Sequence, residues 1–466
     1  MSMMTLAEAA TMLKAGLSGA DASFSAVSTD SRSIAAGDLF VALRGERFDG
    51  HEFIAQVKAA GAVGAVVAAD AADALAVHGL PLIAVADTRL ALGELAAGWR
   101  ARFSLPLIAV TGSNGKTTTK EMIACILTAA YGEEVLATHG NFNNDIGLPL
   151  TLLKLRAHHR AAIIEMGMNH PGEIGYLTKI ARPTVALVTN AQRAHLEGMG
   201  SLDAVALEKG TIYNGLDDDG VAVVNADDAH AFLWRGMNPQ RRVVRFGLDA
   251  AAEVHGKVRL HGLETELRFV TPAGEGAVDL ALPGLHNARN AVAAAAAAFA
   301  AGIPLSAIQS GLAAFHGVKG RLQRRQGTAG AVILDDTYNA NPDSVRAGID
   351  VLASTIGRKV LVLGDMGEIG AASGQFHDEI GGYAKSAGVD VLYALGEASA
   401  IAARNFGGGA YHYKKVEDLI EALRLELTAC ATNATVLVKG SRFMRMERVV
   451  EAIATPLTPT ENKTCS

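Results

Sequence analysis

Residues 107–120 read Leu-Ile-Ala-Val-Thr-Gly-Ser-Asn-Gly-Lys-Thr-Thr-Thr-Lys, and this stretch decides the fold of the middle of the chain. The apolar run 107–110 predicts a buried strand, and the residues after the second glycine show the apolar spacing of a helix. A strand that passes through glycines into a helix is the setting of a phosphate loop, where backbone N–H groups and the helix N-terminus face an anion. The predicted loop consists of Gly112, Ser113, Asn114, Gly115, Lys116, Thr117 and Thr118.

Two side chains of this loop have the chemistry that a nucleoside triphosphate requires. Lys116 would reach the β- and γ-phosphates, and the hydroxyl of Thr117 would ligate Mg²⁺. The spacing GxxGK[ST] is shorter than the common GxxxxGK[ST], which disfavours a general motor protein or GTPase. An ordinary glycine turn before a helix is the alternative, but it does not account for the strand, the Lys-Thr pair and the helix together.

The rest of the chain alternates short apolar runs with helical patterns, which is typical of parallel sheets covered by helices on both faces. Its 466 residues give room for three domains of about 150 residues each. We therefore expect an α/β protein of three domains. These are a small α/β N-terminal domain at 1–103, a central parallel-sheet domain with the phosphate loop at 104–317, and a doubly wound, Rossmann-like C-terminal domain at 318–466.

Several elements can be placed within these blocks. We expect strands at 39–43, 62–68, 82–86, 107–110, 161–164, 185–189, 221–224, 331–334, 359–363, 389–395 and 435–438, and a β-rich stretch at 253–282. We expect helices near 51–60 and 88–102. An Ala-rich helix is expected at 290–301, ended by Gly302 and preceded by an asparagine that could cap it. The polar tail after Pro456 is expected to fray.

Composition and charge exclude several classes of protein. Half of the residues are hydrophobic, which rules out a disordered chain, and a net charge of −6 (42 Lys and Arg against 48 Asp and Glu) argues against nucleic acid as a partner. The three cysteines, Cys125, Cys430 and Cys465, are far apart, so we expect neither a disulfide framework nor a zinc site, and a cytoplasmic location. Without an apolar run of about 18 residues, or a leader-like N-terminus, no membrane insertion or processing is expected.

Polar residues follow many of the expected strands, and in open parallel sheets ligands bind outside those strand ends. Glu165 is a candidate Mg²⁺ ligand or else part of a surface salt bridge, and His195 a second ligand or else structural. The amide-rich stretch 141–149 suits a site or a turn equally well. Lys209, on an expected helix, taken alone would be a solvated lysine. The polar stretch 335–344, with its tyrosine, suits a ribose and a base.

Taken together and in order, these stretches resemble the Mur ligases along the whole chain. The matching stretches are residues 28–32, 37–45, 111–118, 141–149, 165–170, 195–198, 286–290, 320–321, 335–344, 364–368 and 439–442. NFNNDIGLP, EMGMNHPGEI and DDTYNANPDS resemble the member that joins D-alanyl-D-alanine to UDP-N-acetylmuramoyl-tripeptide. The Asn-Pro-Arg motif of the diaminopimelate-adding member is not apparent, because Asn341-Pro342 is followed by Asp343.

The resemblance implies an ATP-dependent amide-bond ligase that uses Mg²⁺ and an acyl-phosphate intermediate. It implies catalytic roles for Lys116, Lys209 and His195, with Lys209 at the position of the carbamylated lysine of the family, and metal ligation by Thr117, Glu165 and His195. The implied nucleotide contacts, besides the loop, are Asn290, Arg321, Asp336, Tyr338 and Asn339. The implied substrate contacts are Ser31, Arg32, Asn141 and Lys439. The partners would be UDP-N-acetylmuramoyl-tripeptide and D-alanyl-D-alanine, bound by a monomer.

Two other functions stay open at this point. Folylpolyglutamate synthase shares the phosphate loop, although it should not need the segment 28–32. A scaffold that binds ATP without ligase chemistry would also keep the loop. Phosphate release that depends on a particular carboxylate and amine would discriminate among the three.

Overall fold

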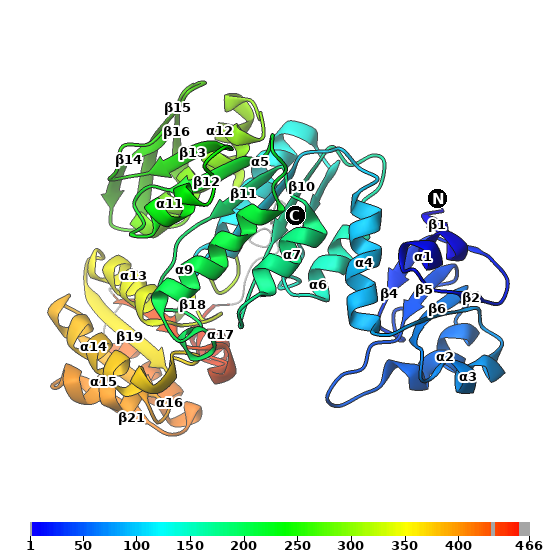
Figure 1. Ribbon diagram of the computed structural model, residues 1–466. Coiled ribbons are helices and arrows are strands. Elements are labelled where there is room, and N and C mark those ends of the chain that lie inside the picture. Colours follow the sequence, from blue (N-terminus) through cyan, green and yellow to red (C-terminus); the bar gives the residue numbers. More distant parts are fainter. Residues whose placement is uncertain (1, 430–433, 456–466) are drawn as a thin grey trace.

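The computed structural model describes residues 2–429 and 434–455, and the expected frayed tail lies outside them. Three separate sheets follow one another along the chain, each with its own helices. In Figure 1 the first lies on the right in blue, the second in the upper centre in cyan and green, and the third at the lower left in yellow to red. The α/β architecture of three units is therefore confirmed. The boundaries at 103/104 and 317/318 stay predictions.

The first unit is a five-stranded sheet of order β2-β7-β6-β5-β4, beside a two-stranded sheet of β1 and β3. Its strands are β1 (Met4–Thr5), β2 (Leu17–Ser18), β3 (Ser23–Phe24), β4 (Ala26–Ser28), β5 (Asp38–Val41), β6 (Gly64–Ala68) and β7 (Leu82–Val85). Its helices are α1 (Leu6–Met12), α2 (Ile54–Ala59) and α3 (Ala72–Leu75). The helix expected at 51–60 begins as a 3₁₀ turn at Gly50, and the Asp49 carboxylate caps this turn by accepting a hydrogen bond from the His51 backbone.

A long helix, α4 (Thr88–Arg100), joins the first unit to the second (Figure 1). The carboxylate of Asp87 caps its first turn by accepting from the backbone N–H groups of Arg89 and Leu90. At its other end the indole of Trp99 donates to the carbonyl of Leu155 at 3.1 Å. The helix packs against α6 and α7 of the central unit, so it fixes where the first unit lies.

The central unit is a nine-stranded sheet of order β16-β15-β14-β13-β12-β11-β8-β10-β9. Strands β8 to β14 pair in parallel with their neighbours in this order, and β14 to β16 form antiparallel hairpins. The strands are β8 (Leu107–Thr111), β9 (Val135–Ala137), β10 (Ala161–Glu165), β11 (Val185–Val188), β12 (Val221–Asn225), β13 (Arg242–Gly247), β14 (Val254–His261), β15 (Glu264–Thr271) and β16 (Gly274–Leu280).

Helices cover both faces of the central sheet, as the continuous apolar runs predict. They are α5 (Lys116–Tyr131), α6 (Gly147–Leu152), α7 (Glu173–Ala181), α8 (Leu196–Met199), α9 (Leu202–Gly210), α10 (Ala231–Gly236), α11 (Leu285–Ala300) and α12 (Leu305–Ala314). Along β8, Leu107 and Ala109 join one buried core, whereas Ile108 and Val110 join the other, which contains α5 and α11. The phosphate loop therefore leaves a strand that is held on both sides.

The Ala-rich helix differs from the prediction at its start. It begins at Leu285 rather than at residue 290, after Gly284 with φ +97°. Nothing between 285 and 289 opposes a helix, and the predicted asparagine cap was wrong. Asn287 lies inside the helix and donates to the carbonyl of Pro283 at 2.8 Å, and Asn290 also lies inside it. Both asparagines are thereby placed on the helix rather than before it.

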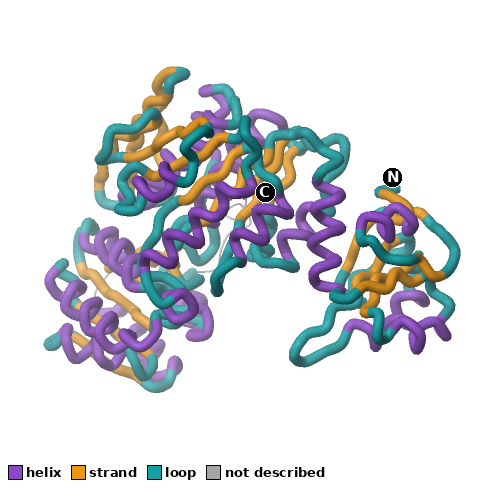
Figure 2. The backbone as a smooth tube through the Cα atoms, in the orientation of Figure 1, coloured by secondary structure: helices purple, strands orange, loops and turns teal. Residues whose placement is uncertain are grey.

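The third unit is a six-stranded sheet of order β17-β18-β22-β19-β20-β21, parallel except for β17. Its strands are β17 (Gln323–Gln326), β18 (Val332–Asp336), β19 (Arg358–Gly364), β20 (Val391–Leu395), β21 (Ala410–Tyr413) and β22 (Ala434–Lys439). Its helices are α13 (Pro342–Ala353), α14 (Ser373–Ser386), α15 (Ser399–Phe406), α16 (Val416–Ala429) and α17 (Glu447–Ile453). Figure 2 shows the helices around these strands, the doubly wound arrangement that was expected.

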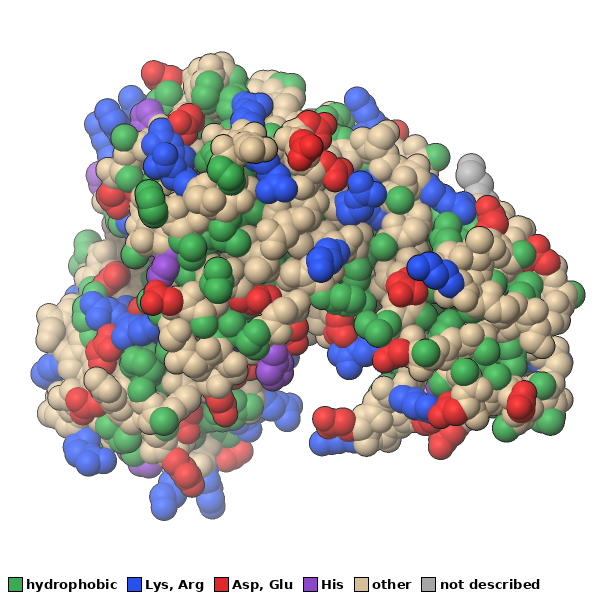
Figure 3. Space-filling view, viewed as in Figure 1, with side chains coloured by type: hydrophobic (Ala, Val, Ile, Leu, Met, Phe, Trp, Pro, Cys, Tyr) green, Lys and Arg blue, Asp and Glu red, His purple; other side chains and the backbone are tan. Residues whose placement is uncertain are grey.

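Two global expectations can be compared with the structure. Cys125, on α5, is disulfide-bonded, which the cysteine spacing did not lead us to expect; the other two cysteines lie outside the described residues. None of the helices within 2–429 and 434–455 is long and apolar enough to cross a membrane. On the face drawn in Figure 3, acidic and basic side chains are interspersed.

Candidate active site

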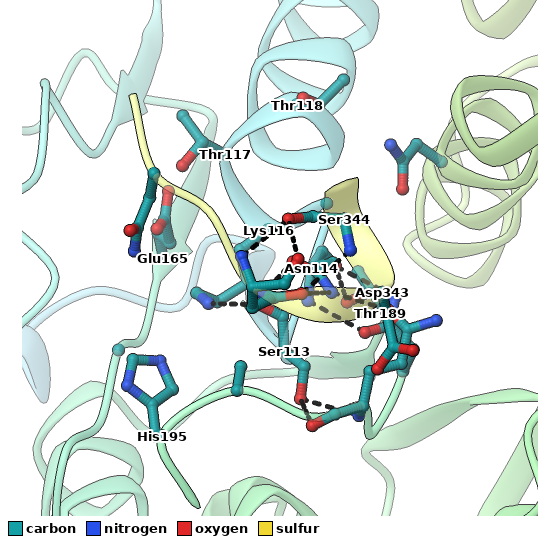
Figure 4. Close-up of a pocket in the computed structure, with 18 of the residues that line it drawn as sticks. Ser113, Asn114, Lys116, Thr117, Thr118, Glu165, Thr189, His195, Asp343 and Ser344 are labelled. Atoms are coloured by element: carbon teal, nitrogen blue, oxygen red, sulfur yellow. Dashed lines mark hydrogen bonds between the residues drawn. The ribbon is translucent and has the colours of Figure 1, made fainter. Parts of the chain in front are cut away.

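A cleft of about 700 Å³ lies between the central and third units. Residues from both units line it, including residues 113–118 of the phosphate loop, Glu165 at the end of β10, His195 after β11, and Asp336 at the end of β18. The strand ends of two different sheets therefore meet at one cavity. In the view of Figure 4, Thr117 and Glu165 lie on one side of Lys116, and Asp343 and Ser344 of the third unit lie on the other.

The phosphate loop depends on two glycines with positive φ. Gly112 has φ +151°, and a Cβ there would lie 1.8 Å from Thr189 Oγ1. Gly115 has φ +80°, and a Cβ there would lie 2.2 Å from Asn290 Oδ1. Both positions therefore exclude a side chain by backbone conformation and by space, and the loop packs directly onto α11 through Gly115.

Lys116 is folded over the loop that it follows. Its Nζ donates to the carbonyls of Gly112 at 2.7 Å and Ser113 at 3.3 Å. Burial lowers the pKa of Lys116 to about 8, while the carboxylate of Glu165 acts in the opposite direction. The ammonium thus lies in a confined position where a phosphate oxygen would stabilise its charge.

Two buried polar atoms near this lysine have no hydrogen-bond partner among the described residues: Oε2 of Glu165 and Nζ of Lys209. The other oxygen of Glu165 accepts from Asn143 Nδ2 at 2.8 Å. Burial, and then the positive charge of Lys116, lower the pKa of Lys209 well below its usual range. Unsatisfied buried polar atoms are rare in folded proteins, so these two stand out among the groups around the cleft.

His195 meets the third unit across the cleft. Its Nδ1 lies 3.1 Å from Oε2 of Glu368, and both residues have left-handed backbones, with φ +59° and +60°. Burial lowers the pKa of His195, which favours the neutral imidazole, while the hydrogen bond to Glu368 acts in the opposite direction. The pKa of Glu368 is lowered by its hydrogen bond to His195, and it stays ionised. Strained backbones at a meeting point of two domains are typical of functional sites.

Charged and aromatic side chains of the third unit, namely Arg321, Asp336, Tyr338 and Lys439, form one side of the cleft, which we call the ionic wall. Nζ of Lys439 donates to Oδ2 of Asp336 at 2.5 Å and to the carbonyl of Asn339 at 3.0 Å. The guanidinium of Arg321 lies 4.0 Å from the ring centroid of Tyr338. A flat cation on an aromatic face beside a carboxylate suits a nucleoside, whose base can stack and whose hydroxyls can donate.

Most of the sequence-predicted residues come together in this cleft, and five do not line it: Gly112 of the phosphate loop, Lys209, Ser31, Arg32 and Asn141. Its lining includes these: Ser113, Asn114, Gly115, Lys116, Thr117, Thr118, Glu165, His195, Asn290, Arg321, Asp336, Tyr338, Asn339 and Lys439. Lys209 is buried behind the lining, so its reading as a solvated lysine was wrong. Ser31 and Arg32 belong to the first unit, where Arg32 pairs with Asp30, and Asn141 lies in an exposed turn.

Residues that the sequence reasoning missed also line the cleft. Arg89, at the start of α4, forms an ion pair with Asp145 of the amide-rich stretch. Gln192, after β11, accepts from Asn114 Nδ2 at 2.7 Å. Neither residue belongs to a recognisable sequence motif. Only their positions, Gln192 shortly after a strand and Arg89 at the start of a connecting helix, could have indicated a place in the site.

A magnesium ion fits this donor set in part. Among the residues that the structure describes, no group of three His, Cys, Asp or Glu side chains could hold a metal. Mg²⁺ commonly takes only one or two carboxylates and completes its shell with water and phosphate oxygens. Glu165, with its unpaired oxygen, and the Thr117 hydroxyl match that demand, whereas Nδ1 of His195 is already paired with Glu368.

Gly115→Ala should weaken nucleotide binding by about tenfold or more, because its Cβ would collide with Asn290 and displace the loop. Gly172→Ala is the matched control. Gly172 is also the N-cap of a central-unit helix, its φ and ψ (89° and −14°) resemble those of Gly115 (80° and −4°), and a Cβ there meets nothing within 4 Å. Calorimetric titration with ADP measures the effect. Equal losses in both variants would attribute it to backbone strain alone and contradict the packing argument.

Comparison with known proteins shows which family has this sequence and this arrangement of units. Three family descriptions match the chain: "Mur ligase family, catalytic domain" over residues 23–100, "Mur ligase middle domain" over 110–298, and "Mur ligase, glutamate ligase domain" over 320–442. An Escherichia coli protein named UDP-N-acetylmuramoyl-tripeptide--D-alanyl-D-alanine ligase is 44% identical over 99% of both chains.

Solved structures agree. The crystal structure of MurF from Acinetobacter baumannii is 36% identical, covers 96% of this chain and 98% of its own, and has a TM-score of 0.89. The Thermotoga maritima MurF ligase in complex with ADP is 28% identical, covers 92% and 96%, and has a TM-score of 0.79. With the phosphate loop and the facing third sheet in a shared cleft, and with similarity over nearly the full length, the chain belongs to the Mur ligase family.

Proposed function

We propose that this chain is an ATP-dependent ligase that joins D-alanyl-D-alanine to UDP-N-acetylmuramoyl-tripeptide, giving the pentapeptide precursor of peptidoglycan with release of ADP and phosphate. The observation that carries the proposal is the cleft itself: Lys116 of the phosphate loop faces an ionic wall from the third unit in one cavity. The 44% identity with the E. coli ligase of that name supports the choice of substrates.

The first half-reaction activates a carboxylate. A terminal carboxylate oxygen of the tripeptide attacks the γ-phosphorus of ATP, the bond to the bridging oxygen breaks, and ADP leaves, which gives an acyl phosphate. Attack by one anion on another requires cations at the phosphate, and Lys116 and the loop N–H groups supply positive charge there. Mg²⁺, held by Thr117 and Glu165, would neutralise further phosphate charge when bound.

The second half-reaction forms the amide bond. The neutral amine of D-alanyl-D-alanine attacks the acyl carbon, a tetrahedral intermediate forms, the C–O bond to the phosphate breaks, and the leaving inorganic phosphate takes up the proton that the amine loses. Glu368 of the third unit lines the cleft and is placed to attract the ammonium form of the dipeptide. Water competes with the amine for the acyl phosphate, so the third unit must cover the intermediate.

We further propose roles for three groups of side chains outside this core. Ser31 and Arg32 bind the UDP part of the substrate on the first unit, which stands apart from the third across the notch in Figure 3. Arg321, Asp336, Tyr338, Asn339 and Asn290 hold the nucleoside of ATP. Lys209 carries a carbamate, formed when its neutral amine adds to CO₂ and releases a proton.

A coupled assay that follows phosphate and amide product tests the proposed function. We expect both products with UDP-N-acetylmuramoyl-tripeptide, D-alanyl-D-alanine, ATP and Mg²⁺, and neither product with a folate and glutamate. Phosphate release with the folate pair would instead favour folylpolyglutamate synthase activity. If no substrate pair stimulates phosphate release, the chain is a nucleotide-binding scaffold.

A further inference from the structure

The loop that follows β11 holds the phosphate loop by several hydrogen bonds. The carbonyl of Asn190 accepts from the backbone of Ser113 at 3.0 Å, and its side-chain oxygen accepts from the backbone of Asn114 at 2.9 Å. The backbone of Gln192 donates to Ser113 Oγ at 2.9 Å. These hydrogen bonds join residues 190–192 to the phosphate loop. A contact made by the next residue, Arg193, therefore also helps to set the position of the loop.

Arg193 connects this body to the third unit. Its backbone N–H donates to Asp343 Oδ2 at 2.8 Å, and its Nε and Nη2 donate to Asp343 Oδ1 at 3.0 and 2.7 Å. Its Nη1 and Nη2 donate to the two oxygens of Glu379 at 2.7 and 3.1 Å. One guanidinium thus donates hydrogen bonds from all three of its nitrogens to two carboxylates, one on α13 and one on α14. We call this set of bonds the Arg193 grip.

Partial burial makes the ion pairs of the Arg193 grip stronger than an ion pair at the surface. The side chains of Arg193, Asp343 and Glu379 are only 24%, 22% and 31% exposed, so solvent and salt screen them less than a pair at the surface. Charge-assisted, bidentate bonds are also stronger than neutral ones. Hydrogen bonding to Arg193 lowers the pKa of Glu379, which keeps this carboxylate ionised.

The Arg193 grip also positions a second contact between the two units, between Asn341 and Asn114 of the phosphate loop. Two residues before Asp343, the side chain of Asn341 caps α13, and its Nδ2 donates to Asn114 Oδ1 at 2.8 Å. In return, Asn114 Nδ2 donates to Asn341 Oδ1 at 3.2 Å. Because Asn341 and Asp343 share the first turn of α13, the place where Arg193 holds Asp343 fixes where the third unit meets the phosphate loop.

We propose that Arg193 is a positioning residue that keeps the third unit closed over the central one while the acyl phosphate waits for the amine. Arg193 is not among the residues that line the cleft in the described parts of the chain, so it acts through Asp343 and Asn341 rather than on a substrate. The inference rests on the proposed function. Its specific consequence is that without Arg193 water reaches the intermediate before the dipeptide does.

The chain contains a matched control for this arginine. Arg346, on α13, donates from Nη1 to Glu379 Oε1 at 2.9 Å and lies 4.2 Å from the ring centroid of Tyr383. It therefore has the same charge and a shared acceptor, but these contacts all stay within the third unit. Arg346→Ala removes a guanidinium from the same network without removing the link to the central unit.

The test compares Arg193→Ala with Arg346→Ala in the full-length protein. For Arg193→Ala we expect the KM for D-alanyl-D-alanine to rise about tenfold and the amide-forming kcat to fall about tenfold. Phosphate released per amide formed should rise from about one to two or more. Arg346→Ala should stay within about twofold of the native protein on all three measures. Arg193→Lys, which keeps the charge but not the fork, should fall between.

Two further measurements keep the inference separate from folding and from the proposed function. Small-angle scattering with ADP should show a larger radius of gyration for Arg193→Ala than for Arg346→Ala, whatever reaction the protein catalyses. Asp343→Asn combined with Arg193→Ala should be no worse than Arg193→Ala alone, and Asp343→Asn serves by itself if Arg193→Ala does not fold. An unchanged phosphate-to-amide ratio, or equal losses in both arginine variants, would overturn the inference. A native protein that forms no amide refutes the proposed function, and the scattering comparison still decides on the clamp.

Discussion

Lys116→Ala should lower dipeptide-stimulated phosphate release about 1,000-fold, the largest effect that we expect from a single substitution. The Nζ of Lys116 lies over the loop carbonyls of Gly112 and Ser113 and carries a partly buried positive charge at neutral pH. When the tripeptide carboxylate attacks the γ-phosphate, negative charge gathers where this ammonium lies. Removing the charge raises the barrier to that step, and amide formation falls with it.

Lys179→Ala provides the control for Lys116→Ala. Lys179 is an exposed lysine on α7 of the same unit, so its loss removes a charge without touching the cleft. Steady-state kinetics with all three substrates, together with thermal unfolding of each variant, separates catalysis from stability. A Lys116→Ala protein that folds and releases phosphate at more than a tenth of the native rate would contradict the role assigned to this lysine.

Lys209→Met should lower kcat by about 100-fold or more, although methionine has a similar length to lysine and its apolar side chain is suited to a buried position. The Nζ of Lys209 is fully buried and unpaired in the described structure, and burial lowers its pKa well below the usual range, which favours the neutral amine. Such an amine can add to CO₂, and the resulting carbamate would place a negative charge near Lys116, in place of a buried, unpaired polar group.

Two measurements follow the carbamate itself. In ¹³C-labelled bicarbonate the native protein should show a carbamate carbonyl resonance that is missing from Lys209→Met. For the smaller variant Lys209→Ala, formate or acetate should restore part of the activity and chloride of equal ionic strength should not, because a small carboxylate can occupy the vacated space. A native spectrum without the resonance at saturating bicarbonate, or a fully active Lys209→Met, would show that Lys209 is not modified in the working enzyme.

The parts of the fold that could be predicted are those encoded in short, continuous patterns. The strand, glycines and helix around Lys116 follow one another within fourteen residues, 107–120, so local rules suffice. The outer strands β17 and β21 were not predicted. The residues of β17, Gln-Arg-Arg-Gln, form an edge of the sheet and include no apolar run. The start of α11 was misplaced because Gly284, rather than a residue with a capping side chain, precedes it.

The candidate site was predictable to the extent that polar residues follow strands. Glu165, His195 and Asp336 could be chosen because each follows an apolar run, and the sheets bring those ends together. The hydrogen bonds between Arg193 and Asp343 could not be predicted, because they join residues 150 positions apart that belong to different units. Opposite charges are too common for such a pairing to be read from sequence. The burial of Lys209 likewise depends on packing that no local pattern encodes.

The central claim is that this chain activates a carboxylate with ATP and then joins it to an amine, and isotope transfer in the coupled assay tests it most directly. The tripeptide is supplied with ¹⁸O in its terminal carboxylate. If the carboxylate attacks the γ-phosphorus and the amine then displaces phosphate from the acyl carbon, each phosphate released with an amide carries one ¹⁸O. Amide formation accompanied by unlabelled phosphate would contradict an acyl-phosphate intermediate and with it the mechanism proposed for this cleft.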